Sequence, residues 1–189
     1  MRLFTCLPIA PDVRDSIAAV QTRLIATGAN IRWVEPENFH LTVSFIGDIA
    51  DPSLLPEIAT ACQSVAAETA PFRFRVAGVS VFPKRGEVIK TVLLTVTEGV
   101  EPWKELVHRS EPWLSPFGAK REGGLAAHVT LGRVKGGENL PELKAAITRE
   151  AKTDCGEQVA DRIILMESVL NLATAAYTER GTWHFKNGI

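Results

Sequence analysis

The sequence predicts an α+β fold in which antiparallel strands alternate with helices, and three observations lead to it. Segments in which apolar residues alternate at period two are interspersed with segments that keep a 3.6-residue period. One short pattern, His-x-Thr, occurs twice in strand-like segments. The interval from Arg2 to His40 equals the interval from Lys90 to His128, 38 residues in each case. We therefore expect two similar halves, each of which carries one copy of the motif.

The first half is predicted to run strand, helix, motif strand, helix, strand, with a short extra strand before the motif strand. Val13, Ile17 and Val20 follow the helical period, and Gly28 ends that helix. Pro52 opens the second helix. The expected strands cover residues 2–9, 31–34, 39–45 and 72–82, and the expected helices cover residues 12–27 and about 51–65.

The second half repeats that order after a predicted hairpin turn at residues 83–87. Its expected strands cover residues 88–96, 127–133, 158–172 and 175–185, and its expected helices cover residues 100–114 and 140–151. A loop is expected over residues 115–125. We predict one bilobed domain over residues 1–189, with pseudo-repeat halves of about 1–83 and 88–172. Two antiparallel sheets, with helices on their outer faces, would then enclose a central cleft.

The two motif strands each place a histidine and a threonine on one face. Alternation predicts that His40, Thr42 and Ser44 share a face, while the neighbouring apolar residues, Phe45 included, point into the core. In the second copy His128 and Thr130 share a face.

A pair of such strands facing one cleft would supply an acid, a base and two hydroxyl donors. Histidine exchanges a proton near neutral pH, and a threonine hydroxyl hydrogen-bonds an anionic oxygen. This set suits attack on a phosphodiester without a metal ion. Coincidence is the competing interpretation, since a short motif carries a risk of false matches. Two of the four histidines have the pattern, and both lie in predicted strands, which favours the functional interpretation.

Composition limits the class of protein. The net charge is −1 and the sequence pI is about 6.4, so we expect any RNA to be held near one end rather than along its length. Cys6, Cys62 and Cys155 are scattered, which favours buried thiols over a disulfide framework or a zinc ribbon. No apolar run has the length of a membrane span. We expect a cytoplasmic monomer that does not bind membranes and needs no cofactor.

The segment Ile31–Asp48, with its motif Phe39-His40-Leu41-Thr42, resembles the two-histidine phosphoesterases. It is similar in particular to the bacterial and archaeal RNA 2′,3′-cyclic phosphodiesterases, first described as 2′-5′ RNA ligases. The Phe82-Pro83 step and the strand near Ser168 fit the same family, so that the resemblance covers nearly the whole chain.

The resemblance implies an activity and a role for each motif residue. The expected reaction is hydrolysis of an RNA 2′,3′-cyclic phosphodiester end to a 2′-phosphomonoester, with 2′-5′ ligation as the reverse reaction. His40 would be the proton donor and His128 the proton acceptor, although the symmetry of the motifs allows the reverse. Thr42 and Thr130 would bind the non-bridging oxygens of the phosphate.

Arg133 is a further candidate for substrate binding, as it follows the second motif. By strict alternation it falls on the core face, so that a site role requires a shift of register near Gly132. His108 and His184 are weaker candidates, since a charged helix surface and a packed last strand explain them.

Other functions stay open at this point. The same chemistry suits ADP-ribose 1″,2″-cyclic phosphate, a 2′-5′ oligonucleotide or another small cyclic nucleotide. A metal site with His40 and His128 as ligands is a weaker alternative, because no third ligand at a recognisable spacing is found. A nucleotide-binding module without activity is the non-enzymatic alternative.

Overall fold

The computed structural model describes residues 1–84, 88–119, 126–170 and 175–186. The predicted turn at 83–87 and the predicted loop at 115–125 therefore lie partly outside the described residues. Three basic residues of that turn and loop, Arg85, Lys120 and Arg121, lie outside them altogether. Within the described part of the chain, no helix is long and apolar enough to cross a membrane.

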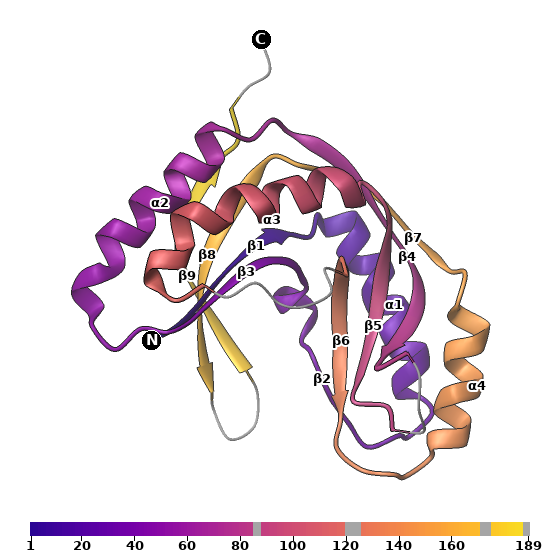
Figure 1. Ribbon diagram of the computed structural model, residues 1–189. Helices are drawn as coiled ribbons and strands as arrows, with labels where there is room; N and C mark the ends of the chain where they lie inside the picture. The colour runs from indigo at the N-terminus through magenta and orange to yellow at the C-terminus, as the bar shows by residue number, and fades with distance from the viewer. Residues whose placement is uncertain (85–87, 120–125, 171–174, 187–189) are drawn as a thin grey trace.

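One curled, mostly antiparallel sheet runs through the molecule, with helices on both sides (Figure 1). Its strands are β1 (Arg2–Pro8), β2 (Ile31–Trp33), β3 (His40–Asp48), β4 (Phe72–Phe82), β5 (Thr91–Glu98), β6 (His128–Val134), β7 (Asp154–Ala160), β8 (Arg162–Leu170) and β9 (Ala175–His184). The helices are α1 (Pro11–Ile25), α2 (Leu55–Ala67), α3 (Val100–Leu114) and α4 (Leu140–Glu150). The predicted α+β class and antiparallel pairing are confirmed.

The sheet divides into two halves that meet at one place. The strand order is β7-β4-β5-β6-β3-β1-β8-β9, with β2 paired to β6. Strands β3 and β6 share the pair Leu41–Val129, which joins the two expected sheets into one. Strand β4 crosses over to lie beside β5, so each half of the sheet contains strands from both halves of the sequence.

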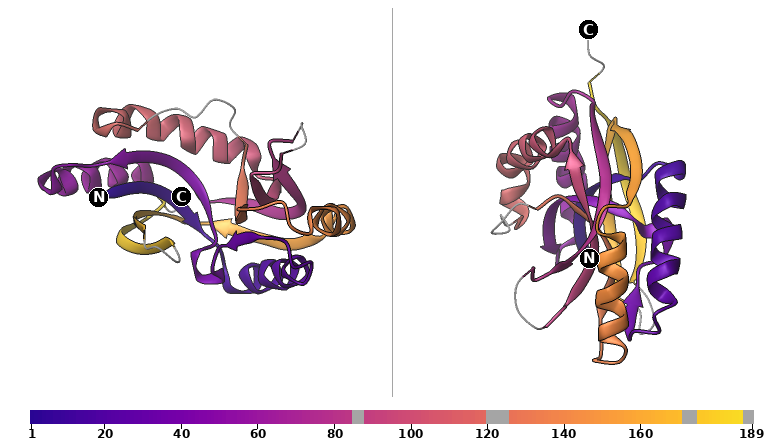
Figure 2. Two further views of the ribbon diagram at one scale, coloured as in Figure 1. Left: turned by 90° about the horizontal axis from the view of Figure 1, so that it is seen from below. Right: turned by 90° about the vertical axis from the view of Figure 1, so that its right-hand side faces the viewer.

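The helices cover opposite sides of the two halves. The buried side of the β1–β3–β8 half packs Leu3 and Leu165 against Ile58 of α2 and Leu114 of α3. The other half packs apolar residues of β5 and β6 against α1 and α4 in the main core. Figure 2 shows α3 and α1 on opposite sides of the strands. Each half therefore keeps one face free of helices, and we call this its open face.

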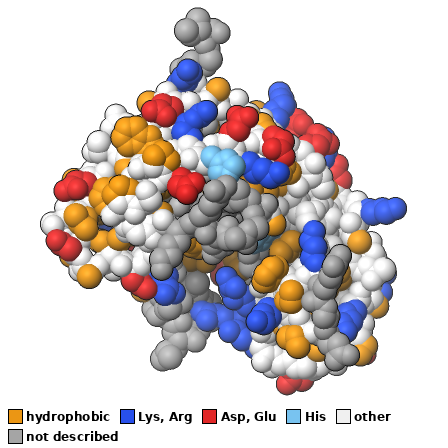
Figure 3. All heavy atoms as spheres, viewed as in Figure 1, with side chains coloured by type: hydrophobic (Ala, Val, Ile, Leu, Met, Phe, Trp, Pro, Cys, Tyr) orange, Lys and Arg blue, Asp and Glu red, His pale blue; other side chains and the backbone are white. Residues whose placement is uncertain are grey.

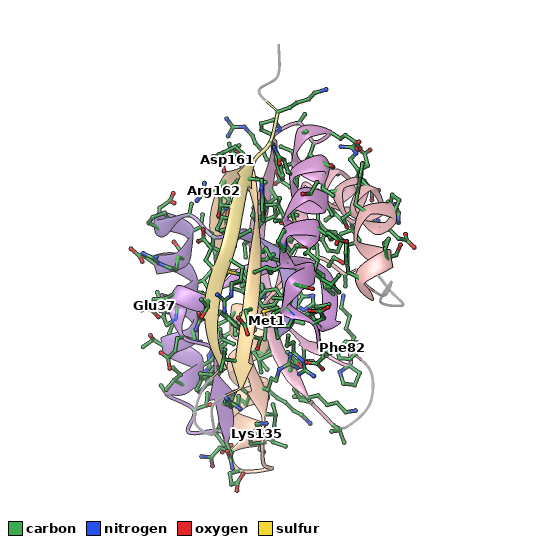
Figure 4. The ribbon with its side chains drawn as sticks, turned by 90° about the vertical axis from the view of Figure 1, so that its left-hand side faces the viewer. Met1, Glu37, Phe82, Lys135, Asp161 and Arg162 are labelled. Atoms are coloured by element: carbon green, nitrogen blue, oxygen red, sulfur yellow. The ribbon has the colours of Figure 1, made fainter. Side chains whose placement is uncertain are left out.

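The prediction of one long strand over residues 158–172 was wrong. The chain forms β7, which pairs with β4, and then β8, which pairs with β1. Figure 4 shows Asp161 and Arg162 at the upper end of the sheet, where the chain passes from one strand to the other. The carbonyl of Asp161 accepts a hydrogen bond from the Phe185 amide. No glycine or proline marks this break, so local patterns could not reveal it.

Candidate active site

The pair Leu41–Val129 organises the candidate site. Both side chains are buried. Because successive side chains on a strand point to opposite faces, the residues just before and just after Leu41 and Val129 point to the open faces. Extending the antiparallel register by one residue sets His40 opposite Thr130 and Thr42 opposite His128. All four side chains are half-buried, as expected for groups that line a cleft. The structure thus brings together the four motif residues.

The two histidines are held in the same way. Nδ1 of His40 lies 2.7 Å from the carbonyl oxygen of Asn38, and Nδ1 of His128 lies 2.7 Å from that of Ala126. A carbonyl only accepts, so each Nδ1 carries the hydrogen. In both rings Nε2 is then the nitrogen left to exchange a proton with a ligand. Equal bonds to residue i−2 give the two imidazoles matching orientations on their strands.

Aromatic rings surround His40. Its ring centroid lies 5.0 Å from that of Phe4 and 5.6 Å from that of Tyr177, and Phe4 also contacts Tyr177 and Phe45. Sequence reasoning missed Phe4 and Tyr177, because Phe4 comes beside β3 only through the pairing of β1, and Tyr177 comes near His40 from β9, two strands beyond β1 in the curled sheet. The aromatic rings form an apolar wall on this side of the site.

The environment of His40 lowers its pKa. Burial beside the aromatic rings disfavours the charged form, the hydrogen bond to Asn38 acts in the opposite direction, and the charge of His128 lowers the pKa further. This electrostatic effect is consistent with the pairing of β3 and β6, which brings the two imidazoles near each other. Their surroundings differ, although their hydrogen bonds match.

The lowered pKa predicts a dependence of stability on pH. The unfolded chain takes up the His40 proton near the ordinary value of 6.5, whereas the folded protein takes it up only at lower pH. The contribution to stability is therefore complete above that value and is lost as the pH falls through the folded pKa. We expect the His40→Asn variant to lose less stability than the wild type between about pH 7.5 and about pH 5.5. Urea unfolding at a series of pH values measures this, and parallel curves would contradict it.

Phe45 and Ser44 differ from the prediction. The β1–β3 register passes from Cys6–Thr42 to Thr5–Ser44 and then to Phe4–Phe45 and Leu3–Gly47, so that β3 contains two irregularities. Phe45 is consequently on the open face beside Phe4 and is 43% exposed, while Ser44 turns to the helix-covered side with Thr5. Strict alternation cannot anticipate a bulge.

A similar irregularity brings Arg133 to the open face. Strand β5 pairs Thr95 with His128, Leu93 with Thr130 and Thr91 with Arg133, and the register shifts between the last two pairs. The three β5 residues alternate regularly and share one face, so their partners share it too. The structure thus has the register shift on which a site role of Arg133 depends. Arg133 is exposed on this face.

Arg32 lies beside Arg133 through the β2–β6 pairing, and sequence reasoning missed it. Burial raises the pKa of Tyr177, whereas the charges of Arg133 and Arg32 lower it. Both guanidinium groups therefore act on a side chain that contacts His40. The remaining histidines, His108 on α3 and His184 at the end of β9, are exposed and lie outside this cluster.

Two side chains of the core support the motif strands with hydrogen bonds. The indole of Trp103 donates to the carbonyl of Thr42 at 3.0 Å. The buried amide of Gln21 donates to the carbonyls of Val34 and Leu131 at 2.7 and 3.0 Å. Gln21 thereby ties α1 to β6 at the point where the register of β6 shifts.

We expect the Gln21→Leu variant to lose about 1–3 kcal/mol of unfolding free energy, because the Val34 carbonyl loses the Gln21 donor inside the protein and the Leu131 carbonyl keeps only its bond from the Val34 amide. Urea unfolding monitored by circular dichroism measures the loss. The matched control is Gln63→Leu on the exposed side of α2, for which a change within about 0.5 kcal/mol is expected. Equal effects of the two substitutions would contradict the role of Gln21.

Known proteins resemble this chain in sequence and in fold. The family described as LigT like Phosphoesterase matches residues 7–90. An RNA 2′,3′-cyclic phosphodiesterase of Methanocaldococcus jannaschii is 32% identical over 172 residues, which are 90% of this chain and 92% of that protein.

The chain belongs to the LigT-like phosphoesterase family.

Other relatives are similar over nearly the whole chain. An RNA 2′,3′-cyclic phosphodiesterase of Methanothermobacter thermautotrophicus is 28% identical over 179 residues, which are 95% of this chain and 96% of that protein. The crystal structure of a Thermus thermophilus protein superposes with a TM-score of 0.81, at 22% identity and 99% coverage of both chains. E. coli LigT complexed with 3′-AMP gives a TM-score of 0.76, at 15% identity and 97% coverage of both chains. The predicted family is confirmed, and the LigT-like phosphoesterase fold is found along the chain.

Proposed function

We propose that this protein hydrolyses the 2′,3′-cyclic phosphodiester at the end of an RNA to a 2′-phosphomonoester, without a metal ion. One observation carries the proposal: His40 and His128 flank the Leu41–Val129 pair with matching Nδ1 hydrogen bonds, and the charge of His128 lowers the pKa of His40. The names of the relatives, RNA 2′,3′-cyclic phosphodiesterases, support the choice of substrate.

The proposed reaction needs one base and one acid on opposite sides of phosphorus. A water oxygen attacks phosphorus while Nε2 of His128 takes the proton of that water. The bond from phosphorus to the ribose 3′-oxygen breaks, and Nε2 of His40 gives that oxygen its proton. The product is a 2′-phosphomonoester with a free 3′-hydroxyl. Attack by a 5′-hydroxyl in place of water breaks the same bond to the 3′-oxygen and forms a 2′-5′ phosphodiester, with the proton transfers unchanged.

The two threonines are proposed to stabilise the charge on the reacting phosphate. The hydroxyls of Thr42 and Thr130 donate to non-bridging oxygens, where negative charge develops in the transition state. Arg133 is proposed to bind the substrate further along the same face. Each histidine faces the threonine of the other motif across the strand pair, so that acid, base and donors surround one small group.

The roles of the histidines depend on the bound phosphate. In the free protein, the lowered pKa of His40 favours its neutral form. A phosphate anion between the rings stabilises the protonated form, most strongly where water is excluded. His40, enclosed by Phe4 and Tyr177, then gains its proton with the substrate and serves as the acid.

An assay on an RNA oligomer that ends in a 2′,3′-cyclic phosphate tests the proposal. We expect the 2′-phosphate as the only product isomer and the same rate with and without EDTA. Loss of activity in EDTA with recovery in zinc would favour the metal alternative. Within the described residues, no three His, Cys, Asp or Glu side chains gather as a metal site. If ADP-ribose 1″,2″-cyclic phosphate is hydrolysed and the RNA is not, the proposed substrate is wrong. If the RNA is bound but not hydrolysed, the proposed activity is wrong.

The oligomeric state and the compartment are two further parts of the proposal. One chain contains both motifs, so a monomer is sufficient for activity.

The cysteines bear on the compartment. All three are buried free thiols, which suits a reducing compartment such as the cytoplasm.

A further inference from the structure

A row of four side chains crosses the open face beyond Thr130. The strand registers pair Phe82 with Thr91, Thr91 with Arg133, and Arg133 with Arg32. Directly paired residues of antiparallel strands project from the same face. The four side chains therefore form one line across β4, β5, β6 and β2, which we call the Arg–Phe row. It lies on the face that carries His128 and Thr130.

One end of the Arg–Phe row suits an anion. Arg32 and Arg133 are directly opposite each other, and like charges in that position repel. A phosphate between them relieves the repulsion and can be held by paired guanidinium hydrogen bonds. Figure 3 shows Lys and Arg side chains gathered at the lower centre of this view, over the region of β2 in Figure 1.

The other end of the Arg–Phe row is an exposed aromatic ring. Phe82 is 61% exposed, although the neighbouring Val81 packs against the core. Figure 4 shows Phe82 toward the outer edge of the molecule, at the end of β4. Aromatic side chains on an open, basic surface stack bases of single-stranded nucleic acid.

The spacing separates this row from the reacting phosphate. Residues two apart on one strand are about 6.6–6.8 Å apart, so the row lies about one such step beyond Thr130 and two beyond His128. Both arginines nevertheless influence Tyr177, which contacts His40. A chain of nucleotides that runs from the two histidines along this face would meet the arginines first.

We propose that the Arg–Phe row is a second subsite, for the nucleotide that precedes the cyclic phosphate; this inference rests on the proposed function. Arg32 and Arg133 hold the phosphodiester that joins the terminal nucleoside to its neighbour, and Phe82 stacks the neighbouring base. The substrate class is accordingly an RNA oligomer, and a cyclic mononucleotide is a poor substitute.

The ratio of kcat/KM for a dinucleotide 2′,3′-cyclic phosphate to that for the cyclic mononucleotide tests the subsite. We expect the wild type to prefer the dinucleotide, and we expect Arg32→Gln and Phe82→Ala each to lower the ratio by about fivefold to a hundredfold. Matched controls are Arg14→Gln on α1 and Trp113→Ala, an exposed aromatic on α3, which should leave the ratio unchanged. Thermal unfolding of each variant checks that it folds. No preference in the wild type, or an unchanged ratio in both variants, would overturn the subsite.

Binding of products separates the subsite from the catalytic proposal. We expect a nucleoside 2′,5′-bisphosphate to bind the wild type at least about fivefold more tightly than the nucleoside 2′-phosphate, and Arg32→Gln to remove that gain. This result without any hydrolysis would retain the subsite and reject the proposed function. Hydrolysis together with equal binding of the two nucleotides would reject the subsite alone.

Discussion

Replacement of His40 or His128 by alanine is expected to lower kcat on a 2′,3′-cyclic phosphate RNA by about 10²–10⁴, the usual contribution of one general acid or base. Each imidazole transfers one proton in the proposed reaction, and its Nδ1 hydrogen bond orients Nε2 for that transfer. Alanine removes the proton carrier, while each strand retains its backbone pairing. The double variant should lose less than the product of the two single effects, since the groups act on one transition state.

Single-turnover rates with saturating enzyme measure this loss without interference from product release. His108→Ala and His184→Ala are the matched controls, because both side chains are exposed and lie outside the site. Near-normal rates in either catalytic variant would reject the two-histidine mechanism.

A substrate with sulfur in place of the 3′-oxygen distinguishes acid from base. A thiolate leaves without a proton more readily than an alkoxide, because a thiol has a pKa of about 8.5. His40→Ala should therefore recover much of its lost rate on this substrate, and His128→Ala should not. The reverse outcome would exchange the two roles and keep the mechanism.

Replacement of Leu41 by alanine is expected to lower the unfolding free energy by about 2–5 kcal/mol and also to reduce kcat of the folded enzyme. Leu41 is 1% exposed, and its removal leaves a cavity in the main core. Within the described residues, Leu41–Val129 is the pair through which β3 and β6 are joined. A looser junction lets the two histidines move apart, and small displacements in an active site cost much rate.

The matched control is Leu24→Ala on α1, which is equally buried in the same core but distant from the junction. We expect a comparable loss of stability, measured by urea unfolding, with kcat per folded molecule unchanged. Equal kcat values for the two variants would show that the junction contributes only to stability.

Much of the fold follows from local patterns in the sequence. The predicted helix over residues 100–114 has the bounds of α3, since its apolar positions keep a helical period between Gly99 and Ser115. The two motif strands also lie where alternation predicts them. The strand predicted for residues 158–172 failed because no glycine or proline marks a break at Asp161, and pairing with two different neighbours divides the segment.

The wrong prediction for Phe45 and the open condition for Arg133 have a common cause. Phe45 was expected in the core and lies on the open face, and Arg133 needed a register shift that the pairing with β5 provides. A bulge depends on the neighbouring strand as well as on the strand that contains it. The sequence could therefore state the condition for Arg133 but could not establish that it is met.

The sequence by itself determined which residues are proposed to carry the chemistry, because His40, Thr42, His128 and Thr130 have a spacing that alternation turns to one face of each strand. Only the tertiary structure decided what surrounds them: the wall of Phe4 and Tyr177, the lowered pKa of His40, and the Arg–Phe row. The physical reason is the separation along the chain between the residues that interact. The direction of a side chain on a strand depends on the few residues around it, whereas its neighbours across a curled sheet come from strands far away in the chain.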